Sequence, residues 1–489
     1  MNVCRITRPA VHLFFQVMFA FLTVTICTPL LARAQIPSRR AGDASRSAPS
    51  ETTISHLREA ASLLQQGRPD DAEPILRRVL VAAPRNPDAH NLLGIILDQR
   101  AEFKAAEREY RTALRLNPSL ISPLANLGVL LARTGRSEEA IRAFETVLQR
   151  VPDHPQATLN LGIQYVSRGD YARALPLLEH AAQLSGDNYQ IRYNVGLAFY
   201  NLNRYDEAVA AFDAASSLSP GSAEPFYYLG LIYWSRHQDE KAAEFWERAI
   251  KLQPNFPEAN FMLGEALRKN RRTEASLEFY KRALDQDPTK LVYYARLGGA
   301  HLLLLQYDKA LDLFQRGAER FPNKPEAYYF VGIAARGRGS YDVAETAFRR
   351  VLKVQPNNID ALAQLGFVVG ERARYDEAEL FLRRAIGISD QHFFAHYDFG
   401  RLLVKTRRYA EAIPILERGV TLKPDNPDVH YQLFIAYSRL KQKEPADREM
   451  ALFRKFDDER KRREKEGASE QDDYIQNWSP TPAPTPKIP

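Results

Sequence analysis

Three histidines have the spacing of metal ligands. His392 and His396 lie four residues apart, which would place them on one face of a helix, and His430 follows further along the chain. Zinc accepts histidine nitrogens in such pairs. Because no carboxylate accompanies them at ligand spacing, packing or polar surface positions explain these residues better, and we expect neither a metal nor a cofactor.

The sequence lacks the usual signatures of catalysis. It contains no phosphate-binding glycine loop, no H-E-x-x-H pair and no nucleophile elbow. The two cysteines, Cys4 and Cys27, both lie near the N-terminus, so the remainder of the chain can form neither a disulfide nor a thiolate metal site. We therefore expect no catalytic residues and a protein that is not an enzyme.

A row of asparagines has binding chemistry of another kind. Asn126, Asn160 and Asn194 follow one another at one constant interval. A side-chain amide both donates and accepts hydrogen bonds, so such a row can hold the backbone of an extended peptide whatever its side chains are. The alternative is a solvated polar position that recurs without binding anything.

The interval that separates these asparagines organises most of the chain. Ten glycines follow one another at exact intervals of 34 residues: Gly94, Gly128, Gly162, Gly196, Gly230, Gly264, Gly298, Gly332, Gly366 and Gly400. A small residue follows each glycine by twelve positions, as Ala208 follows Gly196, and a large apolar residue such as Phe212 follows four positions later. Each unit also contains two stretches of helical length, so the pattern predicts pairs of helices.

The glycine indicates how the two helices of a pair meet. In mid-helix it costs about 0.8–1.0 kcal/mol relative to alanine, so a close approach of the second helix must offset that cost. We expect the alanine of the second helix to meet the glycine, and the large residue to fill the space between units. Aspartates in the intervening turn are expected to cap the second helix: Asp206, Asp308, Asp342 and Asp376.

This pattern resembles the tetratricopeptide repeat family, whose unit is a 34-residue helix–turn–helix. The resemblance implies an all-α fold, a right-handed superhelical solenoid of about twelve repeats over residues 53–460. The first and last units depart from the pattern, with Glu59-Ala60 and Phe434 replacing its usual residues, as expected of capping units.

The resemblance also implies that the first helix of each unit lines a concave groove that binds protein segments. The predicted peptide-binding residues are Asn126, Asn160, Asn194, Tyr193, Tyr200, Tyr227, Trp234 and Phe261. The asparagines are similar to a ladder in the repeat domain of protein O-linked N-acetylglucosamine transferases, although the catalytic region of those enzymes is absent here. For any single aromatic ring, packing against a neighbouring helix is the alternative.

The two ends of the chain differ from the repeats. Residues 1–34 are typical of a secretory signal, with Arg5 and Arg8, an apolar core and cleavage expected between Ala34 and Gln35. A retained signal anchor is the alternative. Residues 35–52 are predicted to be a disordered linker, and residues 461–489 a charged helix extension with a proline-rich disordered tail.

Composition limits the possible partners. The chain of 489 residues is 45% hydrophobic and 26% charged, with a formal net charge of +7 that is not gathered into a basic stripe. We expect protein partners, no nucleic acid, and membrane contact only through the cleaved signal. The predicted function is an exported, periplasmic or secreted scaffold. The alternative is a recruiting subunit of an envelope complex for polysaccharide export or glycosylation.

Overall fold

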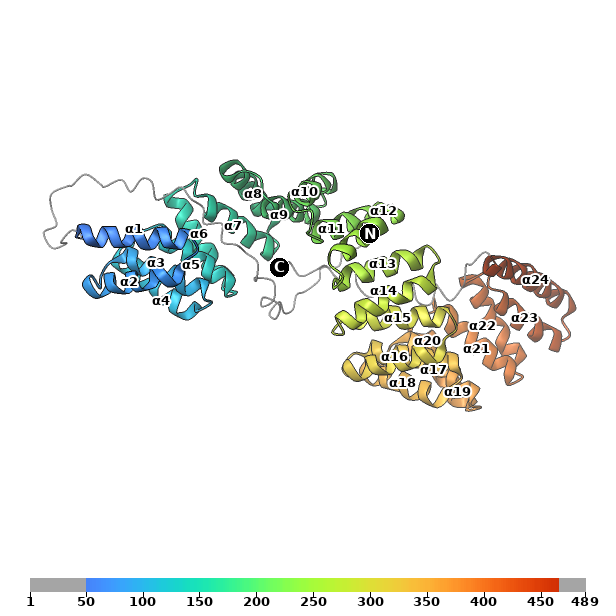
Figure 1. Cartoon of the computed structure of the whole chain (residues 1–489). Helices are drawn as coiled ribbons and strands as arrows, with labels where there is room; N and C mark the ends of the chain where they lie inside the picture. Colours follow the sequence, from blue (N-terminus) through green and yellow to red (C-terminus); the bar gives the residue numbers. More distant parts are fainter. Residues whose placement is uncertain (1–49, 466–489) are drawn as a thin grey trace. The chain divides into compact units, whose positions relative to one another are not determined.

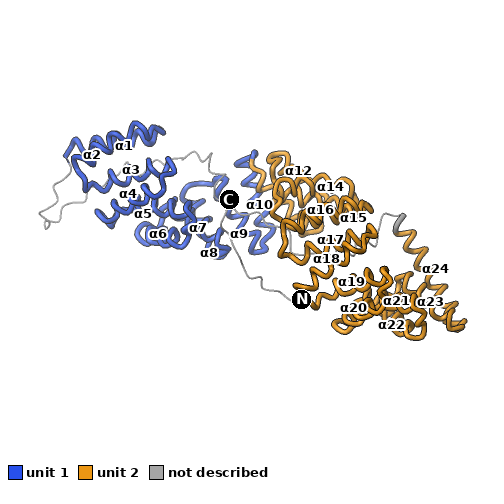
Figure 2. Tube along the Cα trace, turned by 90° about the horizontal axis from the view of Figure 1, so that it is seen from below, with its two compact units in different colours: residues 1–221, 487–489 blue, residues 222–486 orange. Residues whose placement is uncertain are grey.

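The computed structural model describes residues 50–465, and all regular structure within that range is helical (Figure 1). The described chain divides into two compact units, residues 50–221 and residues 222–465 (Figure 2). Each unit is a succession of antiparallel helix pairs, in which each helix packs on the next along the chain. The expected all-α repeat fold is therefore confirmed.

Unit 1 contains five helix pairs. Their bounds are α1 Glu51–Gln65, α2 Pro69–Ala82, α3 Pro87–Gln99, α4 Phe103–Leu116, α5 Ser122–Arg133, α6 Ser137–Arg150, α7 Pro155–Arg168, α8 Tyr171–Ser185, α9 Tyr189–Asn201 and α10 Tyr205–Leu218. The first helix thus begins two residues before the predicted start of the repeats.

Unit 2 contains seven helix pairs. Their bounds are α11 Glu224–Ser235, α12 Asp239–Leu252, α13 Pro257–Lys269, α14 Thr273–Gln286, α15 Leu291–Leu303, α16 Tyr307–Arg320, α17 Pro325–Arg338, α18 Tyr341–Val354, α19 Ile359–Glu371, α20 Tyr375–Ile388, α21 Phe393–Lys405, α22 Tyr409–Leu422, α23 Pro427–Arg439 and α24 Lys443–Lys465. The last helix has 23 residues, against 14 in α22.

The first helices begin where side chains can cap them. The side-chain oxygens of Asn86, Asn358 and Asn426 accept hydrogen bonds from backbone amides in the first turns of α3, α19 and α23. Prolines at the first helical position, such as Pro87, have no N–H that would need a partner there. Local sequence therefore sets where these helices begin.

Within each pair, the recurring glycine lies against the large residue of the second helix. A Cβ atom added at Gly94 would come within 2.6 Å of the Tyr110 ring, and one added at Gly196 within 2.7 Å of the Phe212 ring. Both rings are buried. The large residue therefore fills the space inside its own pair, and not between units as expected, because only glycine leaves room for it. The predicted alanine approaches the glycine less closely, with its carbonyl oxygen within 3.5 Å of the added Cβ in two repeats.

One left-handed residue closes each first helix. In α9 the amide of Asn203 donates to the carbonyl of Tyr200 (3.0 Å), and that of Arg204 to the carbonyl of Phe199 (2.9 Å). This turn needs a positive φ, which is 59° at Asn203. The equivalent residues of the other repeats share it: Gly67, Ala101, Gly135, Gly169, His237, Arg271, Leu305, Gly339, Ala373, Arg407 and Lys441.

The aspartates of these turns are not caps. Asp206 is the second residue of α10, and the capping position is held by Arg204, whose side chain makes no capping hydrogen bond. Asp342 occupies the same place in α18. The prediction of side-chain caps was wrong, because the helix begins two residues earlier than expected. The carboxylates still lie in the first turn, where the helix dipole favours negative charge.

The predicted signal of residues 1–34, almost all of the linker and the proline-rich tail lie outside the described residues. Among the helices of residues 50–465, none combines the length and the hydropathy needed to cross a bilayer.

Candidate protein-binding surface

The first helices of neighbouring pairs contact one another and form what we call the inner face of each unit. In unit 1, α1, α3, α5, α7 and α9 make these contacts in succession. In unit 2, α15 contacts α17, and α19, α21 and α23 make such contacts in succession. Second helices make no comparable contacts with one another in the described chain. The first helices of neighbouring pairs therefore lie side by side on one face of the repeats.

The asparagines of unit 1 are all on first helices but differ in their bonding. The side-chain amide of Asn126 donates to Oδ1 of Asn91 at 3.1 Å. Those of Asn160 and Asn194 donate to backbone carbonyls four residues earlier in their own helices, both at 2.8 Å. Asn126 and Asn160 are partly exposed, whereas Asn194 is buried. The structure does not test peptide binding by these residues, which stays a prediction.

Several of the predicted binding residues are buried. Tyr193 in unit 1 stacks on Tyr189 with ring centroids 5.7 Å apart. In unit 2, Tyr227 is fully buried and Phe261 is 3% exposed. These rings, with Asn194, therefore contact neighbouring side chains in this structure instead of presenting a surface. The physical reason is that the following repeat covers the ring, as Tyr293 covers Phe261 at 5.1 Å.

Two predicted aromatic residues remain partly exposed. Tyr200, on α9, lies 5.9 Å from the ring of Tyr205. Trp234, on α11, contacts Trp246, and the ammonium of Lys269 lies 4.4 Å from its ring centroid. An exposed indole with a cation over it can still contact a partner, so these two positions keep their predicted role as an untested hypothesis.

The inner face of unit 2 carries a charged and aromatic cluster that the sequence did not reveal. The guanidinium carbons of Arg336 on α17 and Arg401 on α21 lie 3.9 and 4.4 Å from the ring centroid of Phe367 on α19. All three side chains are partly exposed. Stacking on an aromatic ring restricts a guanidinium without using its N–H donors. We call this group the arginine–phenylalanine cluster.

The polar partners of the cluster leave it with positive charge. Arg336 donates to the side-chain oxygen of Gln364 at 2.6 Å, which is a neutral partner. Arg401 forms an ion pair with Glu371 at 3.0 Å, and Lys405 lies 3.5 Å from the same carboxylate. One glutamate thus serves two cations, while Arg336 keeps its charge uncompensated by its hydrogen-bond partner.

A buried carboxylate lies beneath the cluster. Asp398 is 4% exposed and lies 3.7 Å from Nε of Arg401. Burial raises the pKa of Asp398, against the opposing influence of Arg336 and Arg401. Asp398, Arg401 and Phe367 help line a cavity of about 10 Å³ beside Gly370.

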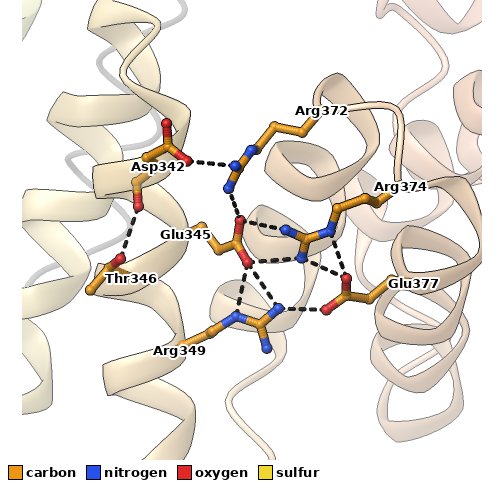
Figure 3. Close-up of polar contacts among 7 residues, drawn as sticks. All are labelled: Asp342, Glu345, Thr346, Arg349, Arg372, Arg374 and Glu377. Atoms are coloured by element: carbon orange, nitrogen blue, oxygen red, sulfur yellow. Dashed lines mark hydrogen bonds and ion pairs between the residues drawn. The ribbon is translucent and has the colours of Figure 1, made fainter.

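A second ionic group joins two neighbouring repeats of unit 2 (Figure 3). The carboxylate of Glu345 on α18 accepts hydrogen bonds from Arg349 (3.0 Å), Arg374 (2.8 Å) and Arg372. Burial raises the pKa of Glu345, but hydrogen bonds from these arginines outweigh it and lower the pKa to about 2. Glu377 also pairs with Arg374. Because every cation has an acid beside it, we interpret this group as structural.

Known proteins match the chain through its repeats. Tetratricopeptide repeat models match residues 57–121, 161–223, 227–290, 296–359 and 332–392, and two related tetratricopeptide models match residues 119–187 and 395–426. These matches cover most of the chain. The chain belongs to the tetratricopeptide repeat family.

Individual relatives are more distant. An uncharacterized protein, y4yS, from Sinorhizobium fredii is 40% identical over 62 residues, which is 13% of this chain and 34% of that relative. The chain therefore spans about a third of the curated relative it matches. Among solved structures, MamA is 26% identical with a TM-score of 0.31, covering 35% of this chain and 94% of that one. Yeast Tom70 is 13% identical with a TM-score of 0.35, covering 80% and 96%.

The tetratricopeptide repeats support a role for the chain as a scaffold for protein–protein interaction. The family makes the inner face the first place to look for a partner. Within unit 2 that face carries the arginine–phenylalanine cluster, whose parts come from three successive repeats. Sequence reasoning missed this cluster because Arg336 and Phe367 do not occupy the same position in their repeats. They are separated by three residues fewer than one repeat length, so aligning the repeats does not bring them together.

The three histidines of this tetratricopeptide array have separate roles. Nδ1 of His392 accepts the amide of Ala395, which makes it the N-cap of α21. His396 Nε2 faces the carbonyl of Asp390 at 3.2 Å, and His430 Nδ1 faces Glu449 at 2.6 Å. Within residues 50–465, no group of three or more histidine, cysteine or acidic side chains is placed to hold a metal.

Proposed function

We propose that the protein is an exported scaffold whose inner face holds a segment of a partner protein, and that the arginine–phenylalanine cluster of unit 2 binds carboxylate groups of that segment. The observation that carries the proposal is the stacking of Arg336 and Arg401 on one half-exposed ring. Both guanidiniums are held in place on the inner face before a partner arrives, which reduces the entropy lost on binding.

The charges favour an acidic segment over a basic one. Arg336 meets a neutral amide, and Glu371 is shared between Arg401 and Lys405. A carboxylate brought by a partner can accept two parallel hydrogen bonds from a guanidinium, and such charge-assisted bonds are the stronger class. The ring of Phe367 adds an apolar surface beside them.

A photocrosslinking experiment tests this placement. Phe367→p-benzoylphenylalanine in the full chain is expected to capture partner proteins from an envelope fraction, and captured peptides should contain acidic residues near the crosslink. Val354→p-benzoylphenylalanine, at an exposed position of the second helix α18, is the control. Capture from position 354 without capture from position 367 would place binding on the opposite side of the repeats.

Loss of the two arginines tests the chemistry. Arg336→Ala with Arg401→Ala is expected to weaken binding of labelled poly-L-glutamate by about tenfold or more, since each charge-assisted hydrogen bond contributes roughly 1.5–3 kcal/mol. Arg282→Ala is the matched control, because Arg282 also lies over a phenylalanine ring, 5.3 Å from the centroid of Phe279, but on a second helix. Equal losses in both variants would show non-specific charge attraction only.

Export is the other part of the proposal. It is supported by the sequence of residues 1–34, with Arg5 and Arg8 before an apolar core and Ala32-Arg33-Ala34 at the expected cleavage site. N-terminal sequencing of the protein from its native host is expected to begin at Gln35. A retained N-terminus in the membrane fraction would indicate an anchor instead.

A further inference from the structure

One aromatic side chain on the first helix of the last repeat is more exposed than its equivalents in two internal repeats. In unit 2, the equivalent rings of α11 and α13, Tyr227 and Phe261, are 0% and 3% exposed. Each is covered by the following repeat, Tyr227 by Phe256 at 5.1 Å and Phe261 by Tyr293 at 5.1 Å. Tyr431 occupies this position in α23 and is 40% exposed. No repeat follows α23 and α24 within the described residues.

Other aromatic side chains extend this exposed surface. The ring of Tyr431 lies 5.1 Å from Phe453 on α24 and 6.2 Å from Phe434, its neighbour one turn along α23. Phe434 and Phe453 are both half-buried. Phe434 also replaces the glycine found at this position in the internal repeats, so it adds a ring to the surface. We call Tyr431, Phe434 and Phe453 the end face.

The chain itself supplies a segment that can cover the end face. It continues beyond Lys465, from position 466 to position 489, and large apolar residues cluster there at Tyr474, Ile475 and Trp478. From Phe453 to Lys465 the helix advances about 18 Å, at about 1.5 Å per residue. The nine residues from Lys465 to Tyr474 can span about 30 Å when extended, so the segment can return to the end face.

Charge favours the same pairing. The last described side chains of α24 include exposed Lys461, Arg462 and Arg463. The segment that follows carries Glu466, Glu470, Asp472 and Asp473, and its first basic residue is Lys487. Acidic residues that precede the apolar cluster would therefore pass close to the basic end of α24 as the chain turns back.

We propose that residues 474–478 of this chain dock on the end face and cover Tyr431 as the following repeats cover Tyr227 and Phe261. The docked segment completes the apolar packing of the last repeat. Burial of apolar surface drives the contact, and the acidic stretch before it sets its direction along the helix. The segment is the occupant instead of a second copy because it is tethered beside the surface, which gives it a high effective concentration.

Photocrosslinking in the full chain tests the contact directly. Trp478→p-benzoylphenylalanine is expected to form crosslinks within one chain, to residues of α23 and α24 around Tyr431. Ile488→p-benzoylphenylalanine, beyond the proline-rich stretch, is the control and should not label the end face. Adding Tyr431→Ala should reduce the crosslink from position 478 by about tenfold, the effect expected from losing burial of one large side chain.

Hydrogen exchange on unlabelled protein provides an independent readout. Trp478→Ala in the full chain is expected to increase exchange of backbone amides in α23, with no change in α5 of unit 1. Crosslinks between two chains in a mixture of tagged and untagged protein would assign the end face to a second copy and overturn the proposal. Crosslinks to other helices, with α23 exchange unaffected by Trp478→Ala, would also overturn it.

Discussion

The inner face of α7 and α9 in unit 1 and that of α17, α19 and α21 in unit 2 are built on the same helix pairs but offer different chemistry. The first carries Asn160, whose side-chain amide donates to a backbone carbonyl of its own helix, and the second carries Arg336 and Arg401 around Phe367. Beneath both, a glycine faces a large side chain of the second helix. The difference shows that packing positions are fixed by the repeat, whereas exposed inner positions vary from repeat to repeat.

The largest predicted effect tests whether packing is equivalent in the two regions. Gly196→Ala in unit 1 and Gly264→Ala in unit 2 each place a Cβ 2.7 Å from a buried ring, that of Phe212 or Tyr280. Both should lower the free energy of unfolding by similar amounts, about 2–3 kcal/mol, through overpacking. Chemical denaturation of the two variants measures this directly.

A third glycine provides the control for that measurement. Gly387, near the end of α20, has no atom within 4 Å of the position of an added Cβ. Gly387→Ala should be neutral or stabilising by up to about 1 kcal/mol, because alanine is the better helix former. If only one of Gly196→Ala and Gly264→Ala markedly lowered the free energy of unfolding, the two regions would not be packed alike.

The second prediction concerns the ionic groups that join neighbouring repeats. In unit 1, Glu107 accepts from Arg111 and Arg136, at 2.9 Å each. In unit 2, Glu345 accepts from the equivalent Arg349 and Arg374 and also from Arg372. Glu345→Gln should therefore lower the free energy of unfolding by about 2 kcal/mol. Glu107→Gln should lower it by less, because Glu107 accepts hydrogen bonds from one arginine fewer.

The pH dependence of the same variant provides the check. The pKa of Glu345 is about 2 in the folded protein against an ordinary value of 4.5. Its stabilising contribution is therefore complete above pH 4.5 and is lost as the pH falls towards 2. Wild type and Glu345→Gln should converge in stability over that acid range. Parallel curves would show that the carboxylate charge contributes nothing.

Much of this fold could be predicted from the sequence, because repeated glycines and large residues mark helix pairs at a fixed interval. What could not be predicted depends on contacts between side chains. The spacing does not say that Phe212, and not Ala208, meets Gly196, since both lie on the same face of α10. Nor does it show that Tyr227 is covered by Phe256, because burial of a ring depends on the repeat that follows.

The candidate site was less predictable than the fold. Family resemblance pointed to the inner face, but the residues chosen there included Tyr193, Tyr227 and Phe261, which are buried. The arginine–phenylalanine cluster joins residues from different positions of three repeats, and its cations lie near Phe367 only because the helices are packed side by side. A search for arginine one repeat after an aromatic residue would have found half of it, since Arg401 follows Phe367 by one full repeat.

The third prediction uses two histidines at the same repeat position in unit 2. Burial lowers the pKa of His430, but the hydrogen bond to Glu449 and that to the Pro424 carbonyl outweigh it, so the pKa is raised above 6.5. Its contribution to stability is therefore complete below pH 6.5 and is lost as the pH rises through the folded pKa. Glu449→Gln should cost about 1 kcal/mol near pH 6 and much less at pH 9.

His396 should behave in the opposite sense. Burial lowers its pKa below 6.5, despite the carbonyl of Asp390 nearby, so stability is retained above pH 6.5 and is lost as the pH falls through the folded pKa. His396→Gln should reduce the loss of stability on acidification, whereas Glu449→Gln should leave that loss unchanged. Urea denaturation across this pH range separates the two, and equal pH curves for both variants would contradict the assignments.

The smallest predicted effect arises at the turns, where the two units again differ. Unit 1 places glycine at three of its five left-handed turn positions, whereas unit 2 has glycine only at Gly339 among seven. Leu305 adopts a φ of 57° in one of these turns and is 59% exposed. A left-handed residue with a Cβ costs roughly 1–2 kcal/mol, partly offset by the greater freedom of glycine in the unfolded chain. Leu305→Gly should therefore stabilise by about 0.5–1 kcal/mol, while Gly135→Leu in unit 1 should destabilise by a similar amount. Thermal unfolding of the pair measures both signs at once, and a loss of stability in Leu305→Gly would mean that the leucine side chain makes contacts worth more than the strain in its backbone.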